Sequence, residues 1–242
     1  MRHWRKRPYD PLLFKGIAHR GLHDAESTEN GMGAFRKAVE AGVAIECDVH
    51  LSKDHHLIIC HDFDLERTTG KKGIIEELTL QEIKEGYRLL DGGEVPTFQE
   101  LYDMVQERVP LVVELKTKPK NNLAVAKQAR KEFRQVKDPS KLAVIAFDPR
   151  ALVCMRSTPF ALGLLVCTNA LWVFGLTGCF DFLDVQDCLV EDPRVLKWKK
   201  KGYLVNVWTI DTEEKLAKVA PHADMITFQD LPVSAIREAI SR

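Results

Sequence analysis

Two carboxylate residues two positions apart, Glu46 and Asp48, interrupt the apolar stretch AIECDVHL, which otherwise has the character of a buried strand. Residues two apart on a strand point to the same face, so we expect the two carboxylates to lie side by side. Like charges in a low-dielectric surrounding are costly unless opposite charge compensates them. The pair therefore predicts a bound cation, neighbouring basic side chains, or both.

Further chemically active side chains stand near the ends of other apolar runs. His19 and Arg20 follow the first run in AHRG, and His61 ends the run LIICH. The run LVVELK carries Glu114 and, two positions later, Lys116. In barrel enzymes the C-terminal ends of the strands form the active site, so we expect all of these residues at one mouth.

The three carboxylates of Glu46, Asp48 and Glu114 offer oxygen ligands alone, a set that favours Mg²⁺ or Ca²⁺ over Zn²⁺. One dication leaves one of the three negative charges uncompensated. An anionic substrate then needs further positive groups, and Arg20 and Lys116 are the candidates, with the guanidinium of Arg20 able to grip phosphate oxygens in a fork.

His19 and His61 complete the set as a general acid and a general base, because an unperturbed imidazole titrates near neutral pH. A divalent metal, a basic clamp and two imidazoles together indicate cleavage of a phosphodiester.

Each feature also has a structural interpretation. The carboxylate pair occurs on solvent-exposed edge strands, and Glu114 and Lys116 are able to form a surface ion pair of little energetic value. A lone histidine at a strand end is more often structural, and Phe147 and Trp208, which end two later strands, are ordinary core aromatics. The convergence of all these residues on one mouth favours the catalytic interpretation.

The elements that must position these residues follow a regular pattern. Short apolar runs alternate with amphipathic segments, which favours βαβ units and a parallel sheet. The predicted strands span residues 16–19, 44–49, 57–60, 111–115, 143–147, 161–166, 182–185, 204–208 and 224–227. The predicted helices span residues 31–41, 97–107, 123–133, 150–156, 193–200, 212–219 and 232–240.

Nine strands are one too many for an eight-stranded barrel. The five residues SKDHH before strand 57–60 are too few for a parallel crossover, so this strand is expected to fold back on the preceding one as a hairpin. The remaining strands predict an α/β fold, a (β/α)₈ TIM barrel. The open doubly wound sheet is the alternative, but the sequence contains no GxGxxG. Residues 64–93 interrupt the alternation and are expected to form a small inserted cap after strand 2, within a single domain spanning residues 1–242.

The composition of the chain limits the classes of binding partner and cellular location that we expect. The 242 residues carry a formal net charge of zero, so no overall field favours nucleic acid, and the expected partner is a small molecule held at a local site. Six cysteines are scattered without CxxC spacing, which favours a reducing compartment. The N-terminal MRHWRKRPYDPLLF is basic and lacks the apolar run of a signal peptide, so a cytoplasmic location is expected.

One segment, residues 159–180, contains no charged side chain and is long enough to cross a bilayer. Its position inside the strand–helix alternation favours a buried strand followed by a helix that faces the core. A bilayer span and an apolar surface in weak contact with lipid are the two alternatives.

The motifs together resemble those of the glycerophosphodiester phosphodiesterase family. They are HRG at 19–21, EN at 29–30, ExD at 46–48, HD at 61–62 and ELK at 114–116, in the order and spacing of that family. The likeness continues through AFDP, VNVWTI and ADMITFQDLP and so covers nearly the whole chain.

The resemblance implies a barrel with a cap after the HD strand. It also implies a divalent metal on Glu46, Asp48 and Glu114, with His19 and His61 as the acid–base pair. Arg20 and Lys116 would hold the phosphate, and Phe147 and Trp208 would line the glycerol or headgroup pocket. Glu29 would lie near the metal or orient Arg20.

Two departures from the family pattern are visible. Gly31 in TENG replaces a residue able to cap the next helix, and in TFQDLP the residues Phe228 and Gln229 separate Thr227 from Asp230. The second departure leaves open what that loop contacts.

Three functions follow as hypotheses. The first is metal-dependent hydrolysis of glycerophosphodiesters to sn-glycerol 3-phosphate and an alcohol. The second is cleavage of lysophospholipids in the manner of a lysophospholipase D, suggested by the uncharged segment 159–180. The third is a non-catalytic barrel whose carboxylates only hold a metal or ligand.

Overall fold

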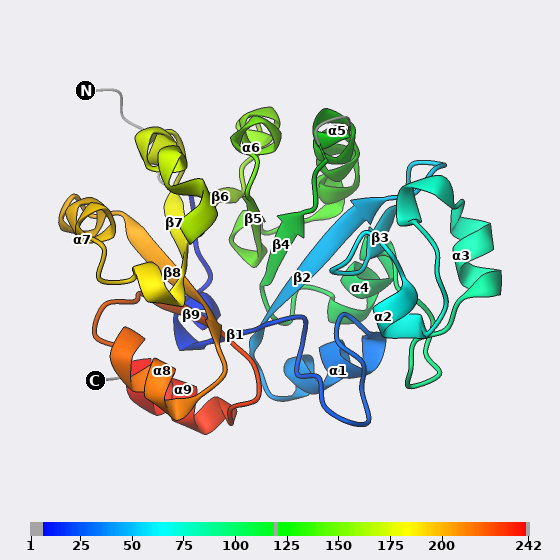
Figure 1. Ribbon diagram of the computed structural model, residues 1–242, viewed down its shortest axis with the longest axis horizontal. Coiled ribbons are helices and arrows are strands. Elements are labelled where there is room, and N and C mark those ends of the chain that lie inside the picture. The colour runs from blue at the N-terminus through cyan, green and yellow to red at the C-terminus, as the bar shows by residue number, and fades with distance from the viewer. Residues whose placement is uncertain (1–6, 119–120, 241–242) are drawn as a thin grey trace.

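Eight parallel strands form a closed ring in the computed structural model, which describes residues 7–118 and 121–240 (Figure 1). Each strand pairs in parallel with the next, and β9 pairs with β1 to close the barrel, which confirms the predicted (β/α)₈ fold. The ring strands are β1 (Ile17–Ala18), β2 (Ala44–Leu51), β4 (Leu111–Leu115), β5 (Leu142–Ala146), β6 (Ala161–Val166), β7 (Phe182–Gln186), β8 (Leu204–Ile210) and β9 (Met225–Phe228).

The ninth strand, β3 (Leu57–Ile59), lies outside the ring and pairs antiparallel with β2, as the short connection requires. Its register places Val49 opposite Ile59. The hairpin therefore returns the chain to the C-terminal end of β2, and the residues that follow β3 arrive beside the carboxylate pair.

Helices surround the ring. They are α1 (Met32–Glu40), α4 (Phe98–Val105), α5 (Asn122–Glu132), α6 (Pro149–Met155), α7 (Pro193–Lys200), α8 (Glu213–Val219) and α9 (Val233–Ile240). Short 3₁₀ turns η1 (Pro11–Lys15), η3 (Phe133–Gln135), η4 (Pro139–Lys141) and η6 (Asp187–Leu189) join them to the strands.

Local sequence explains several helix starts. Thr97 and Glu100 form a capping box before α4, while the side chains of Asp148 and Asp192 accept backbone N–H bonds ahead of a proline at the start of α6 and α7. Gly31 caps α1 without a side-chain bond. A Cβ at Gly31 would lie 2.8 Å from the carbonyl oxygen of Thr28, so the glycine permits a close approach of backbone.

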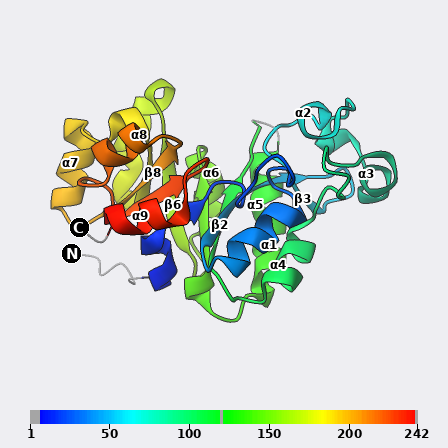
Figure 2. The same cartoon turned by 90° about the horizontal axis from the view of Figure 1, so that it is seen from below.

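The segment 64–93, called the inserted unit below after the prediction, follows β3 and contains α2 (Glu66–Thr69), η2 (Ile75–Glu77) and α3 (Leu80–Gly86). Figure 2 shows α2 and α3 set apart from the ring at the edge that carries β3. Apolar side chains of β3, of the inserted unit and of the residues that flank them form a small core separate from that of the barrel: Ile58, Cys60, Leu65, Ile75, Ile83, Tyr87, Leu89 and Val95.

The barrel interior is apolar at its base and polar above it. Small and medium side chains such as Ala44, Val112 and Ala143 form the base together with Phe182. Gly163 on β6 makes room for Phe182, because a Cβ at that position would lie 2.2 Å from the phenyl ring. Two residues further along β2, β4 and β7 the side chains that line the cavity are Glu46, Glu114 and Asp184, and the functional site begins there.

The uncharged segment contains β6 and the 3₁₀ element η5 (Thr168–Cys179), which is kinked at Ala170. The expected core-facing helix is therefore only partly correct, because Val173, Phe174 and Thr177 are buried whereas Trp172 is 68% exposed. The glycines and threonines of this segment favour short turns over a regular α-helix. Among the described residues no helix has the length and apolar character needed to cross a bilayer.

Candidate active site

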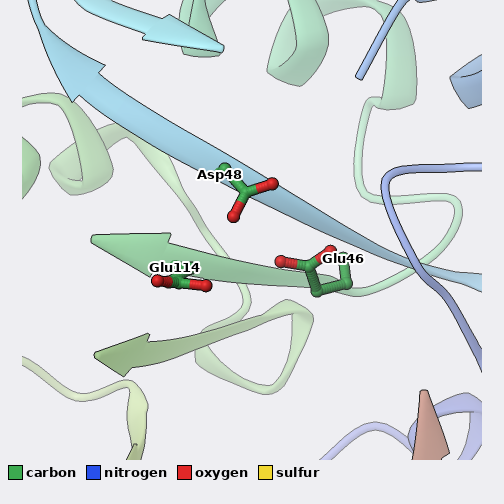
Figure 3. Close-up of side chains that lie close together, drawn as sticks. All are labelled: Glu46, Asp48 and Glu114. Atoms are coloured by element: carbon green, nitrogen blue, oxygen red, sulfur yellow. The ribbon is translucent and has the colours of Figure 1, made fainter. Parts of the chain in front are cut away.

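Three buried carboxylates meet at the C-terminal end of the barrel. Glu46 and Asp48 extend from β2, and Glu114 extends from β4, where it pairs in register with Asp48. One carboxylate oxygen from each residue lies within 4.8 Å of the others, and Figure 3 shows the three groups turned toward a common space. The alternation of side chains along β2 and the parallel register of β4 produce this cluster.

Two basic side chains contact the carboxylates directly. The Lys116 ammonium lies 2.9 Å from Asp48 Oδ1 and 3.0 Å from Glu114 Oε1. The backbone N–H of Arg20 donates to Glu46 Oε2 at 3.0 Å, and its Nε lies 3.5 Å from Asp48 Oδ2. The two cations expected to face a phosphate are thus also partners of the carboxylates.

With all three acids ionised, this cluster would carry one net negative charge, because two basic side chains face three carboxylates. Burial raises the pKa of Glu46 well above its ordinary value, and burial together with Asp48 raises the pKa of Glu114 to about 7. Burial also acts to raise the pKa of Asp48, but the charges of Lys116 and Arg20 outweigh burial and hold the pKa of that carboxyl well below its usual range. Two of the three acids therefore resist ionisation unless more positive charge is present.

These residues fit a divalent cation. The donor set is oxygen only, the three groups converge, and one dication would change the sum of three carboxylates and two basic side chains from −1 to +1. A net positive site at the barrel mouth suits an anionic phosphodiester.

The two histidines have different partners. His19 follows β1, and its Nδ1 lies 2.6 Å from Gln229 Oε1; His61 follows β3, and its Nδ1 lies 2.7 Å from Asp62 Oδ1. Because both partners are acceptors, each neutral ring carries its proton on Nδ1 and its lone pair on Nε2. Burial and the charge of Arg20 lower the pKa of His19 to about 4, and burial also lowers the pKa of His61.

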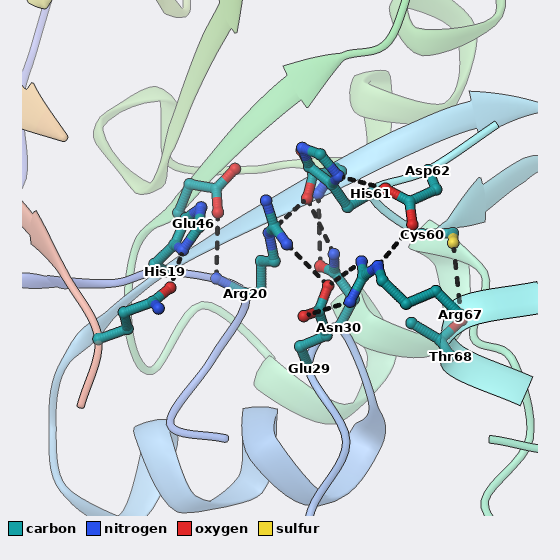
Figure 4. A network of polar contacts seen from close by, with 12 residues as sticks. His19, Arg20, Glu29, Asn30, Glu46, Cys60, His61, Asp62, Arg67 and Thr68 are labelled. Atoms are coloured by element: carbon teal, nitrogen blue, oxygen red, sulfur yellow. Dashed lines mark hydrogen bonds and ion pairs between the residues drawn. The ribbon is translucent and has the colours of Figure 1, made fainter. Parts of the chain in front are cut away.

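A chain of ion pairs connects the inserted unit to the catalytic mouth, as Figure 4 shows. Arg67 on α2 donates to both oxygens of Glu29 at 2.9 and 2.7 Å and to Asp62 at 2.6 Å. Glu29 in turn accepts from Arg20 at 2.8 Å. Glu29 therefore contacts both Arg20 and Arg67, and Arg67 is a neighbour of these candidate residues that sequence reasoning missed.

Asn30 and His50 also support the site. Asn30 Nδ2 donates to Asp48 Oδ2 at 2.9 Å. His50, fully buried on β2, donates from Nε2 to the backbone carbonyl of His61 at 3.1 Å. His50 continues the two-residue alternation that begins at Glu46, and that spacing was the signal for it in the sequence.

A cavity of about 170 Å³ opens beside these groups. Phe147 and Trp208 line it, with their rings perpendicular and their centroids 5.8 Å apart, at the position the sequence suggested for a substrate pocket. The cavity wall also includes Asp184 on β7, which the sequence motifs did not indicate, and Thr227 on β9, the first residue of the TFQDLP motif.

Comparison with known proteins places this geometry in a family. A profile of the Glycerophosphoryl diester phosphodiesterase family matches residues 19–237, from His19 after β1 to a position within α9. The chain belongs to this family. The expected resemblance is therefore confirmed, and with it the assignment to a family of diester-hydrolysing enzymes.

Individual proteins named as phosphodiesterases or as a lysophospholipase D are similar to this chain over most of its length. A glycerophosphodiester phosphodiesterase from Caldanaerobacter subterraneus is 28% identical over 216 residues, covering 84% of this chain and 88% of that protein. A mouse lysophospholipase D is 27% identical over 226 residues, covering 83% and 70%. A solved structure of an Oleispira antarctica phosphodiesterase in complex with the product sn-glycerol-3-phosphate superposes with a TM-score of 0.80 at 25% identity, covering 98% of both chains.

The two departures from the family's motifs have distinct outcomes. Gly31 leaves α1 without a side-chain cap, as expected. Gln229, from the loop whose contacts the sequence left open, is the hydrogen-bond partner of His19. The substitution in that loop therefore bears on the orientation of a candidate catalytic imidazole.

Proposed function

We propose that this protein hydrolyses glycerophosphodiesters to sn-glycerol 3-phosphate and an alcohol. The observation that carries the proposal is the convergence of two of the three clustered carboxylates, two basic side chains and two imidazoles on one cavity. Membership of the phosphodiesterase family and the product complex of the Oleispira protein support the same substrate class.

In this proposal Glu46, Asp48 and Glu114 hold one divalent cation, Mg²⁺ or Ca²⁺. When bound, such an ion acts as a Lewis acid toward phosphoryl oxygens. Arg20 and Lys116 hold the phosphate, since both line the cavity and both are positively charged. Phe147 and Trp208 enclose the organic part of the substrate and exclude water from that side.

The partners of the histidines suggest a division of proton transfer. Asp62 stabilises an imidazolium at His61, so we assign His61 to donate a proton to the leaving alcohol. Gln229 is a neutral partner, and Arg20 disfavours a charge on His19. We therefore assign His19 to accept a proton from the hydroxyl group that attacks the phosphorus. His61→Ala should then lose much less activity on a p-nitrophenyl diester, whose leaving group needs no proton, whereas His19→Ala should fail on both substrates.

The deciding experiment measures glycerol 3-phosphate release from glycerophosphocholine, glycerophosphoethanolamine and glycerophosphoglycerol. The enzyme is treated with EDTA and then supplied with Mg²⁺ or Ca²⁺. We expect activity to return with metal in the wild type and to fall by about 10³-fold or more in Glu46→Ala. Glu40→Ala, which changes an exposed glutamate on α1, is the matched control and should behave as the wild type. Full activity after EDTA treatment would exclude the metal.

Lysophospholipid cleavage is the second candidate, because Trp172 is 68% exposed on η5 and Phe147 is 37% exposed at the mouth. These two side chains provide apolar surface for an acyl chain or for weak contact with a membrane through residues 159–180. The mouse relative named lysophospholipase D supports the comparison. Choline release from lysophosphatidylcholine, together with co-sedimentation on phosphatidylcholine vesicles that Trp172→Ala weakens, tests it; absence of both removes this candidate.

We also propose a cytoplasmic location. All six cysteines are free, and two of them, Cys47 on β2 and Cys60 next to β3, are buried. Free thiols are compatible with a reducing compartment. Fractionation of cells that produce the protein with a C-terminal epitope tag tests this location directly.

A further inference from the structure

The backbone that carries His61 lies outside the regular strand. β3 ends at Ile59, and the N–H of Cys60 still donates to the carbonyl oxygen of Asp48 at 3.1 Å. His61 comes next, in an irregular turn, and its side chain is 35% exposed. Strand pairing and core packing therefore do not fix this imidazole, and its position depends on contacts from other elements.

His50 on β2 supplies one of these contacts. It is fully buried, and its Nε2 donates to the backbone carbonyl oxygen of His61 at 3.1 Å. The His50 ring also meets the ring of Phe63 edge to face, with the centroids 4.6 Å apart. One buried imidazole thus contacts the turn at His61 and again two residues later. Since a hydrogen bond is directional, this contact fixes the turn more closely than apolar packing alone.

The inserted unit encloses the other side of the His50 ring. Glu76 on η2 places Oε1 3.6 Å from Nδ1 of His50. Glu76 is held in turn by the barrel, because Lys118 donates to its Oε2 at 2.8 Å and Asn121 donates to its Oε1 at 3.2 Å. The ring therefore lies between the turn at His61 and the inserted unit, with little freedom to move.

His50 and Asp62 constrain different parts of His61. A proton donor must be placed to within about 0.5 Å, and the location of Nε2 depends on the Cα position and on two side-chain torsions. Asp62 limits the torsions through its 2.7 Å contact with Nδ1, whereas His50 limits the backbone. His50 is absent from the described residues that line the cavity, so it acts through His61 and not on the substrate.

We propose that His50 is a positioning residue for His61. Its Nε2–H fixes the backbone of His61 and thereby the reach of that imidazole toward the leaving alcohol. This inference rests on the proposed function, which assigns proton donation to His61. A histidine that only supports the fold affects turnover of all substrates equally, whereas a positioning histidine affects most the substrate whose leaving group needs the proton.

The test compares kcat on glycerophosphocholine with kcat on the glycerol p-nitrophenyl phosphodiester, whose leaving group needs no proton. His50→Gln brings an amide NH₂ to the place of Nε2, whereas the shorter amide of His50→Asn does not reach the carbonyl of His61. We expect His50→Asn to lower the ratio of the two kcat values about tenfold or more with KM nearly unchanged. His50→Gln should stay within about threefold of the wild type.

His56→Asn is the matched control, because His56 lies in the exposed turn between β2 and β3, and it should keep the wild-type ratio. Melting temperatures are recorded for every variant, and the rates are measured below the lowest of them. Phe63→Ala, which removes the ring against which His50 packs, should lower the ratio about threefold and decides the question if a His50 variant does not fold. An equal fall of both kcat values, or the same loss in His50→Asn and His50→Gln, would overturn the proposal.

The wild type and His61→Ala separate this inference from the proposed function. A wild type that hydrolyses neither diester would contradict the function itself. An active wild type whose ratio falls in His61→Ala but not in His50→Asn would contradict the positioning role alone. A ratio that His61→Ala leaves unchanged would remove the proton assignment and the positioning role together, and the hydrolase would remain.

Discussion

At the scale of single residues, the buried pair Glu46 and Asp48 is stable because opposite charge lies close to it. Lys116 is buried against Asp48 and Glu114, with an exposed fraction of 9%. Breaking a buried ion pair by removing one partner leaves an uncompensated charge and is far more costly than losing a surface pair. The same ammonium is therefore a structural counter-ion as well as a candidate phosphate ligand.

Lys116→Met should lower the free energy of unfolding by about 3–5 kcal/mol in metal-free buffer. Added Ca²⁺ should recover part of this loss, because a dication supplies the missing positive charge. Urea denaturation with and without Ca²⁺ measures both effects. Unchanged stability in EDTA would show that the carboxylates need no counter-ion.

Asp184 gives a prediction for pH. Its pKa is raised from 3.8 to about 8, so the folded state retains a proton that the unfolded state releases. The contribution of this group to stability is complete below about pH 4 and is lost as the pH rises through about 8. Asp184→Asn, which cannot ionise, should therefore gain about 2–4 kcal/mol relative to the wild type between pH 4 and pH 9. Denaturation curves for the two proteins across this range provide the check, and a constant difference would show that Asp184 ionises normally.

At the scale of elements, the inserted unit is tied to the barrel by Arg67. This side chain joins Glu29, which precedes α1, to Asp62, the partner of His61. Arg67 is 48% exposed, so its ion pairs are screened and contribute little to global stability. We propose that these ion pairs orient Arg20 and His61.

Arg67→Met should consequently reduce kcat by about 10–100-fold while changing stability by less than about 1 kcal/mol. Arg88→Met, which replaces another arginine of the same inserted unit, is the control and should retain normal kcat. Steady-state kinetics on glycerophosphocholine and thermal denaturation make the measurement. Equal effects of the two substitutions would indicate that Arg67 only supports the fold of the unit.

At the scale of the whole molecule, barrel closure joins distant parts of the chain. The pairing of β1 with β9 brings His19 and Gln229, 210 residues apart in sequence, within 2.6 Å. The metal candidates, by contrast, come from the adjacent strands β2 and β4. A ligand that binds these carboxylates only in the folded barrel must stabilise the entire domain.

The melting temperature should therefore rise by about 5–10 °C when Ca²⁺ or Mg²⁺ is added at 100 times its dissociation constant. Glu46→Gln should abolish most of the shift, and Glu40→Gln should preserve it. Differential scanning calorimetry provides the values. The absence of a shift for either cation in the wild type would argue against a metal at this cluster.

The sequence alone determined the barrel and most of the site, because both depend on local pattern. The alternation of apolar runs and amphipathic segments predicted every strand of the ring to within two residues, and the two-residue spacing in β2 predicted that Glu46 and Asp48 share a face. Side chains at the C-terminal ends of parallel strands converge in any such barrel, so their meeting also followed from the sequence.

Only the tertiary structure decided which groups touch. Arg67 and Asp184 belong to none of the motifs, and Gln229 belongs to a motif whose contacts the sequence left open, because the partners of these three residues lie on other elements of the chain. Trp172 likewise stands in an apolar run that predicts burial, yet the kinked turn of η5 exposes it. The periodicity of the sequence specifies the face of an element on which a residue lies. The closure of the barrel and the packing of its loops specify which side chain that residue contacts.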